Sequence, residues 1–156
     1  MSKRNKGFTM VEILVVVGLI AILGVIAVIA FGNIQVGVRR SAVAADARSL
    51  ASMINTVNVL ASGNRIEQTA LNGVTGTAGA THAMTVLNAN ASMPATDLVV
   101  PAGARAVAVA GAVTIAAGGN ASVNQTFVDG LTDADMAQTG GDFTFRVQAT
   151  VGSTPP

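Results

Sequence analysis

Hydrophobic residues dominate the beginning of the chain. Residues 13–32 form an unbroken apolar segment without a charged side chain. A helix of about 20 residues, rising about 1.5 Å per residue, crosses the hydrocarbon core of a bilayer, which is about 30 Å thick. The segment therefore predicts a membrane-spanning helix.

One acidic residue stands at the start of this segment. Glu12 is the only ionisable side chain between Phe8 and Arg39, and a carboxylate in lipid costs about 2.5 kcal/mol or more unless it is paired or neutralised. Cleavage of the chain between Gly7 and Phe8 would create a free α-amine four residues before Glu12, within reach on the same helix or on a neighbouring one. We therefore expect the acid and such a cleavage to be functionally linked.

The pattern becomes amphipathic over residues 33–63. Apolar residues recur there at steps of three and four, as on one face of a helix. They are Val43, Ala47, Leu50, Ile54, Val57 and Ala61. Gly63 and Asn64 are the expected helix stop, because glycine readily takes the left-handed conformation that ends helices. We predict one continuous helix over residues 8–62, apolar over 8–32, amphipathic beyond, and about 80 Å long.

Residues 64–156 have the composition of a small globular head. We interpret residues 63–95 as a long glycine-rich loop with one short strand at 84–87. Further short strands are bounded by glycine or proline, and they are predicted at 97–100, 105–110, 112–116, 122–128 and 143–151. The last alternates most clearly, with Phe143, Phe145, Val147, Ala149 and Val151 on one face. We predict an α+β fold in which the helix packs on a small C-terminal antiparallel sheet.

Charge and cysteine content exclude several classes of function. The chain has nine basic and eight acidic side chains and no cysteine, so thiol chemistry is excluded. Lys3, Arg4 and Lys6 precede the apolar segment, and positive charges in that place hold the N-terminus in the cytoplasm. Six basic side chains then remain against eight acidic ones, so we expect no specific nucleic-acid partner.

The residues at the start of the apolar helix form a short motif. They read Lys6-Gly7-Phe8-Thr9-Met10-Val11-Glu12. With the short basic leader before it and the long apolar helix behind it, this motif resembles the class III leader and N-terminus of type IV pilins and their pseudopilin relatives. The resemblance implies the pilin fold and extends to about residue 63.

The resemblance also implies roles for individual residues. A membrane-embedded prepilin peptidase would remove the leader, residues 1–7, by cutting after Gly7, and would N-methylate Phe8. Glu12, with Thr9 beside it, would set the register of assembly by meeting a terminal amine. The proline that the family commonly carries 22 residues into the mature chain is Ile29 here, so no proline kink is expected.

On this resemblance we expect a structural subunit of a type IV pilus. It is type IVa-like, because the leader is short and the first mature residue would be Phe8. Its partners would be copies of itself in a helical filament, the prepilin peptidase, the inner-membrane assembly machinery, and the membrane before assembly. We expect it in the bacterial inner membrane with a cytoplasmic N-terminus, and then in an extracellular pilus for adhesion, motility or DNA uptake.

Other readings of the N-terminus remain open. A pseudopilin of a type II secretion system shares every N-terminal feature and works as a short piston, and a minor pilin shares them too. A binding module on a plain membrane anchor would keep residues 1–7. An ordinary secretory signal would place its cleavage site after the apolar core, near residues 27–30, and would leave Glu12 without a role.

The head offers few candidates for chemistry. Asp129, Asp133 and Asp135 are a weak calcium candidate, since three carboxylates within seven residues can hold the ion, but a turn followed by an acidic first helical turn explains them equally well. His82 stands alone in the predicted loop. We therefore expect no catalytic residues, no cofactor and no enzymatic activity.

Overall fold

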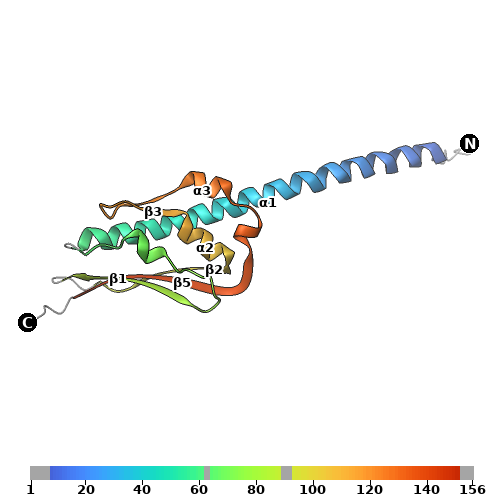
Figure 1. Cartoon of the computed structure of the whole chain (residues 1–156). Helices are drawn as coiled ribbons and strands as arrows, with labels where there is room; N and C mark the ends of the chain where they lie inside the picture. The colour runs from blue at the N-terminus through green and yellow to red at the C-terminus, as the bar shows by residue number, and fades with distance from the viewer. Residues whose placement is uncertain (1–7, 62–63, 89–92, 152–156) are drawn as a thin grey trace, which may run out of the picture. The chain divides into compact units, whose positions relative to one another are not determined.

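The computed structural model of the chain describes residues 8–61, 64–88 and 93–151, and only the backbone of Asn33 and Asn88. Two compact units are present, Met1–Gly37 and Val38–Pro156. The elements are α1 (Met10–Leu60), the 3₁₀ helix η1 (Gln68–Leu71), β1 (Thr81–Asn88), β2 (Thr96–Gly103), α2 (Ala104–Gly111), β3 (Val113–Ile115), β4 (Ala121–Val123), α3 (Gln125–Gly130), the 3₁₀ helix η2 (Ala134–Met136) and β5 (Gln138–Val151). The long N-terminal helix and the α+β fold are therefore confirmed (Figure 1).

The second half of α1 supplies much of the core of the unit Val38–Pro156. All six residues of the predicted apolar stripe are buried, with at most 4% of any of them exposed. Ala44 and Ala51 widen the stripe, and Leu50 and Ile54 are fully buried at its centre. The predicted helix end at Gly63 lies outside the described residues, within which α1 ends at Leu60.

A three-stranded sheet forms the other side of this core. Its order is β1-β5-β2, so that the last strand of the chain lies in the middle (Figure 1). β2 pairs with β5 antiparallel, as expected, whereas β1 pairs with it parallel, from Thr81 opposite Thr144 to Asn88 opposite Val151. The sheet is therefore mixed rather than purely antiparallel, and β1 is longer than the strand predicted at 84–87.

The alternating apolar residues of β5 are buried on one face of the sheet, as predicted, except at the strand end. Phe143, Phe145, Val147 and Ala149 are buried, whereas Val151 at the strand end is 55% exposed. The rings of Phe143 and Phe145 meet edge to face, with centroids 5.0 Å apart, an arrangement that aromatic quadrupoles favour. One face of the sheet thus closes the core, and the other faces solvent.

The strand predicted at 105–110 is wrong, because this segment is helix α2. Its alternating Val and Ala residues satisfy a two-residue period, but alanine is the strongest helix former, and Ala106, Val109 and Ala110 bury one helical face. The chain changes direction at Gly103, whose φ of 105° is a backbone conformation that glycine adopts easily and other residues rarely adopt. A Cβ there would lie 2.8 Å from the Ala137 carbonyl oxygen.

The strand predicted at 122–128 is also wrong over most of its length. Only the short β4 is extended, and it pairs with β3 in a two-stranded antiparallel ribbon. The Asn124 side chain then accepts a hydrogen bond from the Phe127 backbone N–H at 3.1 Å and caps α3. An N-cap asparagine of this kind favours helix over strand in the residues that follow.

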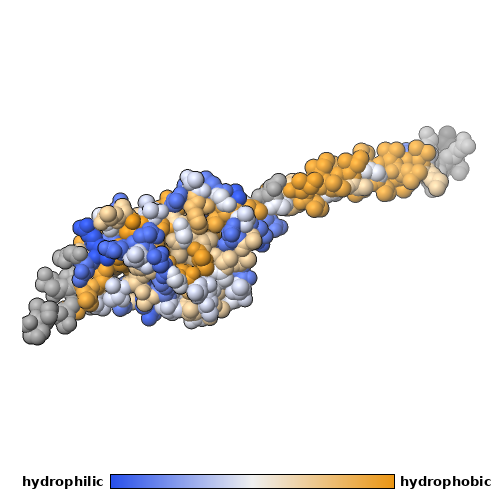
Figure 2. Space-filling view, in the orientation of Figure 1, coloured by the Kyte–Doolittle hydropathy of each residue, from blue (hydrophilic) through white to orange (hydrophobic). Residues whose placement is uncertain are grey.

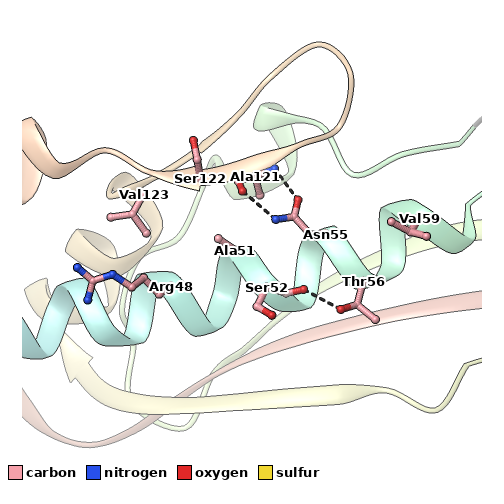
Figure 3. Close-up of a pocket in the computed structure, with 9 residues that line it drawn as sticks. All are labelled: Arg48, Ala51, Ser52, Asn55, Thr56, Val59, Ala121, Ser122 and Val123. Atoms are coloured by element: carbon pink, nitrogen blue, oxygen red, sulfur yellow. Dashed lines mark hydrogen bonds between the residues drawn. The ribbon is translucent and has the colours of Figure 1, made fainter.

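Two amide side chains close the edges of this ribbon. Asn55 of α1 donates to the Ala121 carbonyl at 2.9 Å and accepts from the Ala121 N–H at 2.7 Å (Figure 3). Gln68 accepts from the Ile115 N–H at 2.7 Å and donates to the Val113 carbonyl at 3.3 Å. Both outer edges thereby receive hydrogen bonds that a neighbouring strand would otherwise provide.

A cross-strand ion pair on the solvent side of the sheet gives a pH prediction. Arg146 faces Asp97 directly and donates to both of its carboxylate oxygens, at 2.8 and 2.6 Å. These hydrogen bonds lower the pKa of Asp97. The pair therefore stabilises the fold fully above the unfolded-state pKa of about 3.9, and its contribution is lost as the pH falls through the lowered folded-state pKa.

We expect Asp97→Asn to lower the unfolding temperature at pH 6 and the difference from wild type to vanish toward pH 2. An unchanged difference at pH 2 would contradict this.

Candidate functional site

The start of α1 is shaped by Thr9 and Glu12. A Glu12 carboxylate oxygen accepts hydrogen bonds from the Thr9 backbone N–H and hydroxyl, both at 2.9 Å. The Thr9 hydroxyl oxygen in turn accepts from the Glu12 N–H at 3.3 Å. Because α1 begins at Met10, Thr9 is the N-cap and Glu12 the third helical residue. This reciprocal arrangement is a capping box, which satisfies backbone donors that the first turn leaves free.

The capping box adds a partner for Glu12 that the sequence analysis did not consider. Glu12 has local hydrogen-bond partners even with residues 1–7 still attached, so a terminal amine is not its only possible partner. The spacing of a threonine followed three residues later by a glutamate, just before an apolar run, is a known sequence signal for such a cap. Applied here, it would have identified the structural role of Thr9.

The side chains of α1 that follow the cap are not packed against other described residues of their unit. Throughout residues 8–32 they are exposed, and large ones such as Leu14, Ile20 and Phe31 are 62–64% exposed. Figure 2 shows this surface as a nearly continuous hydrophobic one. The helix is long and apolar enough to cross a membrane. Its exposure distinguishes it from the buried core helix of a globular protein.

Small residues interrupt this apolar surface. A Cβ added at Gly18, Gly24 or Gly32 would meet nothing within 4 Å. No close contact with a described residue therefore requires these three glycines, although each weakens a helix in water by about 1 kcal/mol relative to alanine. Between membrane helices, small residues permit close approach, so their use fits packing against another helix.

The residues at the expected cleavage position are only partly described. Phe8 is 84% exposed and directly precedes the capping residue Thr9. Gly7 lies outside the described residues. Roles in leader cleavage, in N-methylation and in assembly therefore stay predictions for Gly7, Phe8, Thr9 and Glu12.

The three acids considered for calcium are each engaged separately. Asp133 forms an ion pair with Arg39, and Asp129 accepts from the Gln125 amide at 2.9 Å. Asp135 accepts from the N–H and the hydroxyl of Thr132, and these bonds lower the pKa of Asp135. Within the described part of the chain, no three acids or histidines are grouped to hold a metal ion. Each of the three acids thus has its own hydrogen-bond or ion-pair partner, and a calcium site there stays a prediction.

His82 lies on strand β1 rather than in the loop where the sequence placed it. Its Nε2 is 2.6 Å from the Ala70 carbonyl oxygen, and its ring meets Phe145 edge to face at 6.3 Å. The side chain thus packs between η1 and the sheet. The ring is partly buried there, which is a structural position beside the core of the head.

Comparison with known proteins gives one match. No curated protein and no solved structure matches the chain. The family model described as the prokaryotic N-terminal methylation motif matches residues 2–28, which include the basic leader, the capping box and most of the exposed apolar helix. The chain therefore carries the prepilin leader of the type IV pilins and pseudopilins.

Proposed function

We propose that this protein is the structural subunit of a type IV pilus. It is held in the inner membrane by the first half of α1, loses residues 1–7 to the prepilin peptidase, and then polymerises with copies of itself into a surface filament. The role is structural rather than catalytic. The observation that carries the proposal is the apolar half of α1, which follows the processing motif and is exposed throughout residues 8–32.

Exposure of this apolar helix to water is unfavourable, so we expect lipid or neighbouring helices to cover it. Burying a large aliphatic side chain is worth about 1.5–3 kcal/mol. Lipid provides that burial before assembly, and neighbouring helices can provide it afterwards. A single exposed salt bridge contributes only about 0–1 kcal/mol. Apolar packing therefore supplies the cohesion of the filament, and polar groups at the helix start decide its register.

The free amine that cleavage creates at Phe8 would lie next to the capping box. In the membrane, Glu12 is satisfied locally by Thr9. In a filament, the oxygens of the same carboxylate can also accept hydrogen bonds from the methylated amine of a neighbour, since a carboxylate offers about four acceptor positions. Copies that stack in the correct register would gain this charged contact in an apolar surrounding, where a misplaced charge is costly.

Mass spectrometry and electron microscopy of filaments sheared from the host cells test the proposal. We expect the subunit to begin with N-methyl-phenylalanine at Phe8 and to be the main component of long filaments. A protein that still contains residues 1–7 would show a plain membrane anchor and contradict the proposal. A processed protein found only in short filaments that depend on secretion genes would instead identify a pseudopilin.

A further inference from the structure

One asparagine of the head stands directly before a glycine. Asn72 is the only asparagine in the chain that a glycine follows. The two residues form an exposed turn after η1, and Asn72 is the C-cap of that 3₁₀ helix. Gly73 has a φ of 83°, and a Cβ added to it would meet nothing within 4 Å. The space beside the Gly73 backbone is therefore open on the side where another residue would carry its side chain.

Hydrogen bonds do not hold the two groups that could react in this turn. Within the described residues, the Asn72 side-chain amide has no hydrogen-bond partner, and neither has the Gly73 backbone N–H. The Asn72 backbone N–H donates to the Thr69 carbonyl at 3.1 Å, but this bond leaves the side chain free to rotate. The side-chain carbon Cγ of Asn72 can therefore approach the backbone nitrogen of Gly73.

Such an approach permits an intramolecular ring closure, and asparagine is among the thermolabile residue types. The Gly73 nitrogen attacks Cγ of Asn72, and the new C–N bond closes a five-membered succinimide ring. The side-chain nitrogen of Asn72 leaves as ammonia and takes the proton that the Gly73 nitrogen gives up. Water then opens the ring at either of its two carbonyl groups, which forms one carboxylic acid and leaves one amide bond. The reaction needs only water and yields aspartate or isoaspartate at position 72.

We propose that Asn72 is a site of spontaneous deamidation, which converts it to a mixture of aspartate and isoaspartate as the protein ages. Each converted subunit gains one negative charge, so that the chain without residues 1–7 changes from six basic against eight acidic side chains to six against nine. The isoaspartate form also adds one carbon atom to the main chain at the end of η1. The site goes beyond the proposed function and does not depend on it, since the reaction requires only the folded head and water.

Asn120 provides a matched comparison within the same chain. It is also exposed, and its side chain makes no hydrogen bond to a described residue. The next residue, however, is Ala121, whose backbone N–H donates to the Asn55 side chain at 2.7 Å (Figure 3). This hydrogen bond holds the nitrogen that would have to attack, and the alanine side chain crowds it. Ring closure at Asn120 should therefore be slower than at Asn72.

Peptide mass spectrometry compares the two sites directly. The full-length protein in detergent is kept for days in a mildly alkaline buffer made with heavy-oxygen water, and samples are digested with trypsin, which cuts at Arg105 between the two asparagines. We expect Asn72 to convert at least about tenfold faster than Asn120, with one heavy oxygen atom in each product and with isoaspartate present. Conversion of Asn72 that is no faster than that of Asn120, or no conversion at either residue, would overturn the proposal.

The variant Asn72→Gln provides the second test. Glutamine keeps the amide, but its longer side chain would have to close a six-membered ring, which forms much more slowly. Because position 72 is exposed, the substitution should leave the fold and its stability nearly unchanged. On isoelectric focusing, the wild-type protein should accumulate a more acidic form with time, and the variant should not. Equal accumulation of the acidic form in both proteins would show that another residue is the source and would contradict the proposed site.

Discussion

Filament yield is expected to fall at least about tenfold when Glu12 is replaced by alanine, while leader cleavage and membrane insertion continue. An unpaired charge within an apolar helix bundle costs about 2.5 kcal/mol or more, and about 1.4 kcal/mol already corresponds to a tenfold change in an equilibrium constant. In the Glu12→Ala variant the methylated amine of a neighbour would be left without its acceptor. Filaments sheared from equal amounts of cells and quantified by immunoblot measure the effect.

The capping box requires a control that separates two roles of the same side chain. Glu12 accepts from Thr9 at 2.9 Å, so alanine removes both the helix cap and the charge. Glu12→Gln retains an oxygen that can accept from the Thr9 N–H, because glutamine also serves in capping boxes, but removes the charge. Thr9→Ala weakens the cap and retains the charge.

The three variants give distinct results. If the carboxylate sets the register, Glu12→Gln should assemble as poorly as Glu12→Ala, and Thr9→Ala should assemble nearly normally. If the residue only caps the helix, the order should reverse, since losing a cap costs about 0.5–2 kcal/mol. Normal filament yield from both Glu12 variants would exclude a role of this residue in assembly.

The parts of the fold that the sequence predicted well depend on local periodicity. The buried stripe of α1 and the alternation of Phe143 and Phe145 in β5 each repeat over many residues, and the environment of each residue follows from its position in the repeat. The leader was recognisable for a different reason, since a charged residue beside an apolar helix is costly and therefore informative. In each case the signal lies within one continuous segment.

The errors occur where short segments satisfy two periods or depend on distant partners. Residues 104–111 alternate like a strand, but their alanines favour a helix, and Gly103 determines where that helix begins. Asn124 caps α3 through a bond to Phe127 that the apolar pattern does not reveal. The parallel pairing of β1 with β5 joins segments about 60 residues apart, and no local pattern specifies such a register.

The sequence pattern also failed to identify the structural role of one polar residue of α1. Asn58 lies beside Val57 in the helix, and the sequence pattern offered it no role. In the structure it is the one buried polar side chain of the described residues, with 7% of its surface exposed. Its amide donates to the Gly119 carbonyl at 2.6 Å and to the Ile66 carbonyl at 3.3 Å, and its oxygen accepts from the Ile66 N–H at 2.8 Å.

Replacing Asn58 with leucine should destabilise the head by about 3 kcal/mol, because each buried group left without a hydrogen bond costs about 1–3 kcal/mol. The two side chains have the same number of heavy atoms and the same branching at Cγ, and leucine leaves no cavity, so the loss comes from the unpaired N–H of Ile66 and carbonyl of Gly119. The unfolding temperature should fall by about 10 °C, measured on the full-length protein in detergent by resistance to protease on heating.

Asn64→Leu is the matched control for this substitution. Asn64 is exposed, and its side-chain hydrogen bond to a described residue is a long one of 3.5 Å to the Leu87 carbonyl, so its replacement should change stability by no more than about 0.5 kcal/mol. Hydrogen exchange adds a local readout, since the Ile66 amide should lose its protection in the Asn58 variant and keep it in the Asn64 variant. Equal unfolding temperatures for the two variants would show that Asn58 does not hold the Ile66 and Gly119 segments against the end of α1.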